Sequence, residues 1–142
     1  MTTENDGRLA SLKRPLLYLM SLLYIGAGVM HFLRPKVFAR IVPPTLPRPL
    51  TLVYLSGVAE IVLGVGVLFR RTRRRSAWGL VGLLVAVFPA NVYMATSTVP
   101  PETVSERTAG VARLALWARL PFQAVLALWA WWYTQDASTD PD

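Results

Sequence analysis

The chain has 142 residues and a net charge of +7, with 54% apolar residues, 16% charged residues and no cysteine. Soluble domains have roughly 25% charged residues, and so short a chain cannot bury this much apolar surface in a soluble fold, so the composition indicates a membrane protein. Because cysteine is absent, disulfides, thiol redox chemistry and thiolate metal or iron–sulfur sites formed by this chain are excluded.

Four nearly uncharged stretches of about twenty residues, the length that crosses a bilayer, follow one another along the chain. These spans are predicted at residues 15–33, 50–69, 76–98 and 111–133. The polar segment 1–14 before them and the acidic segment 134–142 after them are expected to be disordered. Five prolines in residues 34–49 forbid a continuing helix between the first two spans, although a short turn fits there. The prediction is an all-α bundle of four transmembrane helices, one domain over residues 15–133.

Basic residues flank the spans unevenly. Eight lie on the side of the two chain ends and six on the opposite side. The run RRTRRR (70–75), predicted to connect the second and third spans, supplies five of the eight. Since cytoplasmic loops carry the excess of Lys and Arg, both termini are expected in the cytoplasm, with the protein in a bacterial-type plasma membrane. Topology and contact with anionic lipid explain the positive charge, so no nucleic-acid partner is expected.

The fourth span is only marginally apolar. Its eight Leu, Val or Phe residues favour insertion by roughly 2.4–4.8 kcal/mol, whereas the charge of Arg119 opposes it by about 2.5–3.5 kcal/mol. The second span has twelve Leu, Ile, Val or Phe residues, which outweigh its Glu60. We therefore expect the fourth span to need a polar partner within the membrane.

Each span also carries polar residues in the half of the membrane away from the chain ends. Counted inward at 1.5 Å per residue, Glu60 lies about 15 Å deep, Arg119 about 12 Å and Asn91 about 10 Å. His31 lies about 3 Å deep, and Gln123 shares a helix face with Arg119 because the two are four residues apart. The sequence predicts one shared polar site in the bundle interior, formed by His31, Glu60, Asn91, Arg119 and Gln123.

These residues also have structural interpretations, which stay open. Glu60 and Arg119 can form an ion pair between the second and fourth spans, Asn91 can hold helices together, and His31 can be solvated near the interface. Intramembrane charges are nevertheless a functional hypothesis by default, because the bilayer makes them costly. A single histidine cannot supply a multi-histidine zinc or bis-histidine haem site, and no glycine-rich phosphate loop, GxSxG or HExxH motif occurs. Neither a metal site nor a catalytic residue is predicted.

Four short segments follow one another with a characteristic order of residue types. They are GAGVMHFLRPKVFARIVPP (26–44), SGVAEIVLGVGVL (56–68), FPANVYMA (88–95) and RLPFQ (119–123). In this order they resemble the DoxX-like family of small integral membrane proteins, over residues 15–133. The resemblance implies a four-helix bundle in which the same five polar residues are recurring positions.

The resemblance also implies a kind of function. The founding DoxX-like member is the membrane subunit of a thiosulfate:quinone oxidoreductase, and other members accompany redox-stress enzymes. An accessory membrane subunit without catalytic activity of its own is therefore expected, with a redox enzyme or membrane complex as partner and quinone as the candidate cofactor. Two alternatives stay open: a quinone- or lipid-binding redox component that uses the polar residues, and a small proton-coupled transporter. A homodimer would supply the helices that a transporter of this size lacks.

Overall fold

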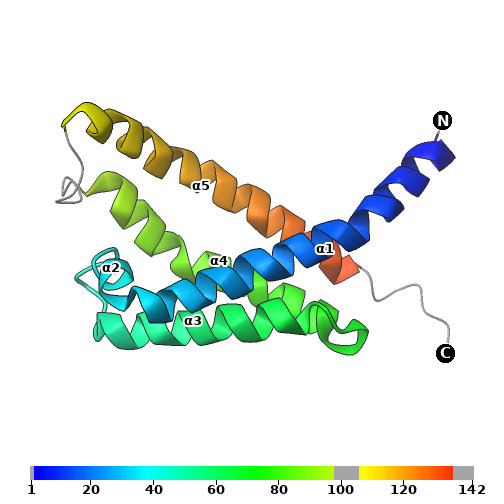
Figure 1. Ribbon diagram of the computed structural model, residues 1–142, viewed down its shortest axis with the longest axis horizontal. Coiled ribbons are helices and arrows are strands. Elements are labelled where there is room, and N and C mark those ends of the chain that lie inside the picture. Colours follow the sequence, from blue (N-terminus) through cyan, green and yellow to red (C-terminus); the bar gives the residue numbers. More distant parts are fainter. Residues whose placement is uncertain (1, 98–105, 136–142) are drawn as a thin grey trace.

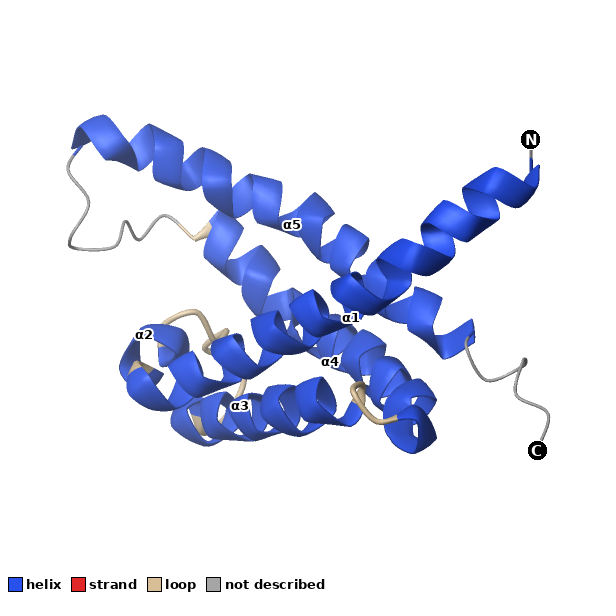
Figure 2. Cartoon of the chain, turned by 45° about the vertical axis from the view of Figure 1, so that its right-hand side comes forward, coloured by secondary structure: helices blue, strands red, loops and turns tan. Residues whose placement is uncertain are grey.

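A computed structural model describes residues 2–97 and 106–135, and these residues contain helices but no strand (Figure 1 and Figure 2). The helices are α1 Thr2–Leu33, α2 Pro35–Ala39, α3 Pro49–Gly66, α4 Arg70–Thr96 and α5 Glu106–Thr134. The four that are long and apolar enough to cross a membrane cover Gly7–Leu33, Pro49–Gly66, Arg70–Thr96 and Thr108–Thr134. The chain is a multi-pass membrane protein, and the predicted all-α class with four spans is confirmed.

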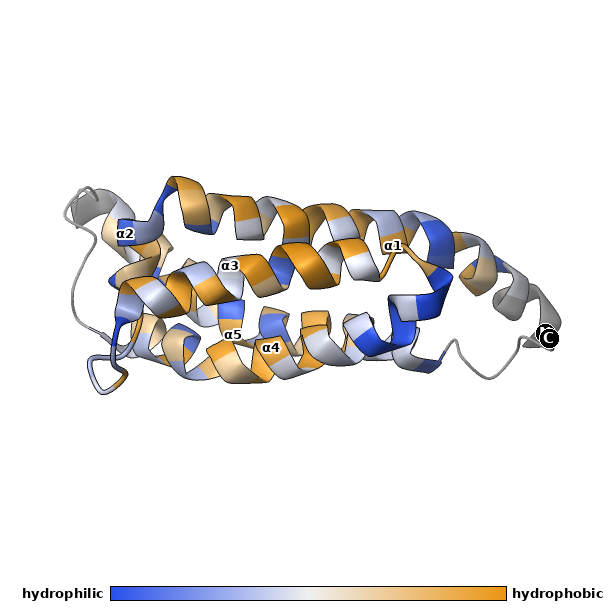
Figure 3. Ribbon diagram, turned by 90° about the horizontal axis from the view of Figure 1, so that it is seen from below, coloured by the Kyte–Doolittle hydropathy of each residue, from blue (hydrophilic) through white to orange (hydrophobic). Residues whose placement is uncertain are grey.

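The four long helices are arranged as two pairs. α1 packs along α3 and α4 packs along α5, while α3 and α4 contact each other over a shorter length. Figure 3 shows the first pair lying on one side of the molecule and the second pair on the other. In Figure 1, α5 crosses α1 near the two chain ends and diverges from it toward the opposite end. The polar residues of the two pairs are therefore positioned by separate helix–helix contacts.

The buried core lies where the two pairs meet. It is formed by Leu17, Met20, Tyr24, Val67, Ala77, Leu80, Leu84, Ala130 and Tyr133. The Tyr133 hydroxyl donates a hydrogen bond of 2.8 Å to the Lys13 carbonyl, which ties α5 to α1 at this end. Elsewhere the long helices expose large apolar side chains, as helices in lipid can, because lipid tails are as apolar as leucine.

The first helix begins earlier than expected. The segment 1–14 was predicted to be disordered, but α1 starts at Thr2 and contains Pro15. Leu9, Ala10 and Leu12 are good helix formers, and a proline within a helix can bend it without ending it. At the other end, α5 includes Thr134, and residues 136–142 of the predicted acidic tail lie outside the described part of the chain.

The basic run 70–75 is not the connection that was predicted. α4 begins at Arg70, so the run forms the first turns of that helix. Figure 3 shows this hydrophilic segment where α3 is followed by α4. The Thr72 hydroxyl donates to the Gly66 carbonyl at 2.7 Å, and Arg73 Nε donates to the Val67 carbonyl at 2.9 Å. These side chains satisfy carbonyls that the end of α3 leaves without helical partners.

The proline-rich connection between α1 and α3 contains the short turn that was expected. Pro35 begins α2, which is five residues long. The Phe38 ring of α2 stacks on the His31 imidazole of α1 with a centroid distance of 4.1 Å. The connection thereby folds back and covers one side of His31.

Candidate functional site

The contact between α1 and α3 is unusually close because glycines face each other across it. A Cβ atom on Gly28 would lie 2.6 Å from the Gly57 carbonyl oxygen, and one on Gly64 would lie 3.2 Å from the Ser21 carbonyl oxygen. The Ser21 hydroxyl also donates a hydrogen bond of 2.6 Å to the Gly64 carbonyl. Small residues at such positions let two membrane helices approach each other. Glu60, which lies between Gly57 and Gly64 of α3, is consequently held against α1.

Glu60 lies beside His31 in this contact. Glu60 Oε2 is 3.2 Å from His31 Nδ1, and the two side chains are only 14% and 13% exposed. His31 Nδ1 is also 2.7 Å from the carbonyl oxygen of Ala27, to which a protonated Nδ1 donates. The carboxylate and the imidazole therefore form a largely buried pair of opposite potential charge.

Two polar atoms in this contact have no hydrogen-bond partner among the described residues. They are Glu60 Oε2, whose approach to His31 lacks hydrogen-bond geometry, and the hydroxyl of Tyr24. Tyr24 is 7% exposed. Because buried polar atoms are nearly always paired, this unused donor of α1 and unused acceptor of α3 mark a place where a small polar group can bind.

The contact between α4 and α5 holds a second polar pair. Asn91 Nδ2 donates a hydrogen bond of 2.7 Å to Gln123 Oε1, and Gln123 Nε2 donates to the Leu84 carbonyl oxygen. Asn91 and Gln123 are 7% and 6% exposed. Pro89, in the same stretch of α4, has no N–H to give to the helix. This amide pair is the helix-to-helix hydrogen bond expected of Asn91.

Arg119 does not join either pair. Its side chain is exposed, and it forms no hydrogen bond or ion pair with any residue that the structure describes. The predicted ion pair between Glu60 and Arg119 is therefore wrong. The physical reason is that α3 and α5 do not pack against each other, so Glu60 turns toward α1.

The five predicted residues thus form two separate pairs and one exposed arginine instead of a single site. Tyr24 was missed as a site residue, as was the contribution of Ser21. Both lie on the helical stripe that ends at His31, with spacings of three and four residues that bring side chains to one face. That spacing is the signal in the sequence that could have identified them.

A family model described as a domain of unknown function, DUF8561, matches residues 20–134. The chain is a DUF8561 protein. The match covers about four-fifths of the chain, from α1 to the end of α5, and includes all the polar residues discussed above. No curated protein and no solved structure matches it. Membership of DUF8561 assigns no activity, and the resemblance to DoxX-like proteins stays a prediction.

The amide pair of this DUF8561 protein leads to a prediction about stability. Gln123→Leu should lower the free energy of unfolding by about 1 kcal/mol, because Asn91 and the Leu84 carbonyl both lose a buried partner. The double variant Asn91→Leu/Gln123→Leu should recover part of that loss, since only the Leu84 carbonyl then lacks its side-chain donor. Thermal unfolding in detergent, followed by circular dichroism, measures both. Unchanged stability of Gln123→Leu would show that the pair does not hold α4 to α5.

Proposed function

We propose that this DUF8561 protein is an accessory subunit of a larger membrane complex and that it binds its partner through α5. The observation that carries the proposal is Arg119, an exposed arginine without an ion pair or hydrogen bond among the described residues. The partner is a membrane protein that presents an acidic or amide side chain to this arginine.

The outer surface of α5 is nearly uncovered. In the most apolar 18-residue stretch of α5 only 6% of the residues are buried, compared with 28% in that of α1. Val111, Leu114, Val125 and Leu128 of α5 are each more than half exposed. Lipid alone can cover such apolar side chains, so the bare face does not by itself identify a protein contact. The charge of Arg119 within this face is what points to a protein contact.

Arg119 lies near the middle of the span Thr108–Thr134. A charge at the centre of a membrane helix opposes insertion by about 2.5–3.5 kcal/mol. Arginines near helix ends reduce this penalty by extending toward the interface, but the middle of a span is the least favourable place for that. Intramembrane charges almost always face a partner. A polar group on a neighbouring chain would also stabilise the marginal insertion of α5.

The proposal includes a bacterial-type plasma membrane and cytoplasmic chain ends. Its support is the excess of basic residues around the chain ends and the start of α4, because positive charge is retained on the cytoplasmic side. The hydrogen bond between Tyr133 and Lys13 brings the ends of α1 and α5 together on that side. The resemblance to DoxX-like proteins is the reason for proposing a redox-linked complex.

Photo-crosslinking in the native membrane tests the partner contact. A photoreactive phenylalanine analogue at Phe122, which is 56% exposed and one turn from Arg119, should give a discrete crosslinked polypeptide. The matched control is the same analogue at Val85 of α4, which is 67% exposed and should label lipid only. Arg119→Gln should reduce the yield at position 122 by at least about fivefold, because it removes the charge that the partner pairs.

Two outcomes would contradict the proposal: no polypeptide crosslinked at position 122, or a yield that Arg119→Gln leaves unchanged. If the only crosslinked product has twice the mass of this chain, the partner at α5 is a second copy of the chain and not another subunit. Because Arg119 has no partner within the described monomer, Arg119→Gln should not destabilise the isolated protein, and its melting temperature in detergent serves as the folding control.

The unpaired atoms of Tyr24 and Glu60 favour a second candidate, the binding of a polar headgroup such as that of a quinone. Tyr24 can donate a hydrogen bond to a quinone carbonyl, and Glu60 can accept one from the hydroxyl of the reduced form. This donor set fits the group chemically. The close contact of Gly28 with Gly57 leaves no space for a quinone ring between α1 and α3 at that level. The ring would therefore have to lie beside this contact.

A further inference from the structure

At the end of the bundle that carries the chain ends, two adjoining cavities of about 410 Å³ and about 390 Å³ share the lining residues Arg14, Leu17 and Arg73. The first cavity also reaches Lys13 and Tyr133. The second extends toward Arg70 of α4 and toward Tyr18 and Leu68. Both are far from the polar pairs described above, because they lie at the opposite end of α1.

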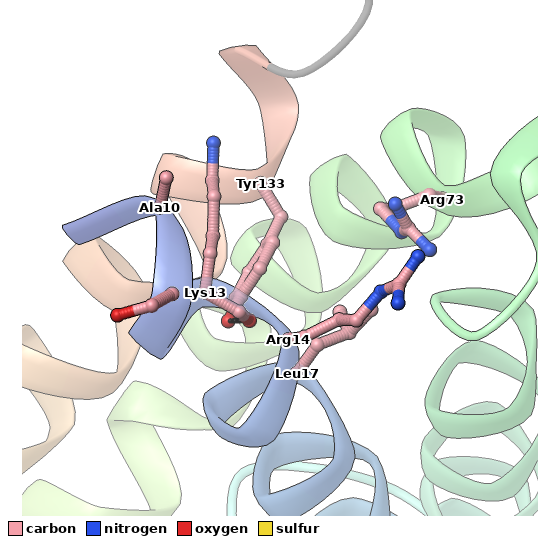
Figure 4. A pocket seen from close by; sticks show the side chains of 7 residues that line it. Ala10, Lys13, Arg14, Leu17, Arg73 and Tyr133 are labelled. Atoms are coloured by element: carbon pink, nitrogen blue, oxygen red, sulfur yellow. Dashed lines mark hydrogen bonds between the residues drawn. The ribbon is translucent and has the colours of Figure 1, made fainter. Parts of the chain in front are cut away.

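The polar lining of these cavities is strongly cationic. Lys13, Arg14, Arg70 and Arg73 are the charged residues that line them, and no carboxylate occurs among the described lining residues. Figure 4 shows the side chains of Arg14 and Arg73, from α1 and α4, pointing toward each other. Two like charges in this arrangement repel each other unless an anion lies between them.

The two arginines differ in how firmly they are held. Arg73 is fixed, because its Nε donates to the Val67 carbonyl at 2.9 Å and its Nη2 to the Leu68 carbonyl at 3.3 Å. Figure 4 shows the guanidinium group of Arg73 lying beside that of Arg14. Arg14 has no hydrogen bond or ion pair with any residue that the structure describes. The guanidinium groups therefore offer unused donors, one of them in a preset position.

We propose that Arg14 and Arg73 bind a phosphate group between them, and that the phosphate is the headgroup of an anionic phospholipid. Guanidinium groups match phosphate oxygens geometrically through paired N–H donors. Arg70 and Arg73 lie at the start of the span Arg70–Thr96 and Tyr133 at the end of the span Thr108–Thr134, which is the level of lipid headgroups. Leu17, Tyr18 and Leu68 provide an apolar path beside the charges for acyl chains. The same chemistry would also hold free inorganic phosphate, and the experiment separates the two sources.

Native mass spectrometry of the full chain, released from mild detergent and titrated with phosphatidylglycerol, tests the proposal. The first bound lipid should bind about tenfold more weakly to Arg14→Gln, since a charge-assisted hydrogen bond is lost. Arg73→Gln should weaken binding similarly. The matched control is Arg71→Gln, which removes the same charge from the same run but does not line either cavity, and it should change affinity by less than about twofold.

Equal weakening by Arg14→Gln and Arg71→Gln would overturn the proposal, because it would mean that general surface charge attracts the lipid. Unchanged binding in Arg14→Gln would overturn it as well. Arg73 also bonds to carbonyls after α3, so the lipid affinity of Arg73→Gln is used only if its melting temperature is unchanged. If that temperature falls, Arg14→Gln alone decides the test. If millimolar inorganic phosphate displaces the lipid, Arg14 and Arg73 still form a phosphate site, but the ligand is the free anion and the lipid assignment is wrong.

Discussion

His31→Leu should lower the free energy of unfolding by about 3–5 kcal/mol, the loss typical when one partner of a buried charged pair is removed. The substitution leaves the carboxylate of Glu60, only 14% exposed, without the imidazole that lies 3.2 Å from it. It also removes the ring that stacks on Phe38 and holds α2 over the end of α1. Thermal or denaturant unfolding in detergent measures the change.

The control for this variant is Met30→Leu, which alters the preceding residue on the exposed face of α1 and should be nearly neutral. The double variant His31→Leu/Glu60→Leu should recover most of the lost stability, because replacing both partners of a buried pair by apolar residues is often neutral or stabilising. Equal stability of His31→Leu and the wild type would show that the pair does not stabilise the fold.

The same double variant separates the two proposed roles of this site. If it is stable and the complex still assembles, but a quinone that copurifies with the wild type is lost, the Tyr24–Glu60 region binds that ligand. If neither the wild type nor the variant retains quinone, the pair is a structural feature and the second candidate function is wrong. Organic extraction of the purified proteins followed by mass spectrometry gives the readout.

Gly28→Ala should destabilise the protein by about 1–3 kcal/mol, the range found when atoms are added to a packed contact. The added Cβ would lie 2.6 Å from the Gly57 carbonyl oxygen and 2.7 Å from Ile61 Cγ1. Backbone cannot move aside as a flexible side chain can, so α1 and α3 must separate. That separation would also draw Glu60 away from α1. Unfolding in detergent measures the loss of stability.

Gly26→Ala is the matched control, since it makes the same change two residues earlier on the same helix. Nothing lies within 4 Å of the Cβ that it would add. Alanine favours a helix over glycine by about 0.8–1.0 kcal/mol, so this variant should be slightly stabilised. Opposite signs for the two variants would establish that the glycine contact, and not helix propensity, sets the result. The same sign for both would contradict the close packing of α1 on α3.

The amino-acid sequence predicts the four membrane helices because twenty apolar residues in a row have no other way to satisfy their backbone in lipid. It predicts the ends of these helices less well. The basic run 70–75 was placed between two spans and the polar start of α1 was expected to be disordered, yet both are helical. Charge opposes burial in lipid but not helix formation, so a helix can continue past the end of its apolar stretch.

The sequence also identified the polar residues within the spans, because a charge or amide in an apolar stretch stands out whatever the helix arrangement. Gly57, Glu60 and Gly64 follow one another at intervals of three and four residues, which puts them on one stripe of a helix, and the structure has both glycines and Glu60 against α1. What spacing cannot provide is the identity of the facing helix. By depth alone Arg119, at about 12 Å, matched Glu60 at about 15 Å better than His31 did at about 3 Å, yet the structure places Glu60 beside His31.

Only the tertiary structure decided that Glu60 pairs with His31, that Asn91 pairs with Gln123, and that Arg119 is left exposed on α5. Depth along a membrane helix follows from residue number, so the sequence alone determined how many spans the chain has and which polar groups lie inside them. Pairing depends on which helices touch, and that is set by packing between residues far apart in the chain, such as Gly28 and Gly57. The opposed arginines Arg14 and Arg73 became visible for the same reason, because they lie on different helices and only the fold brings them together.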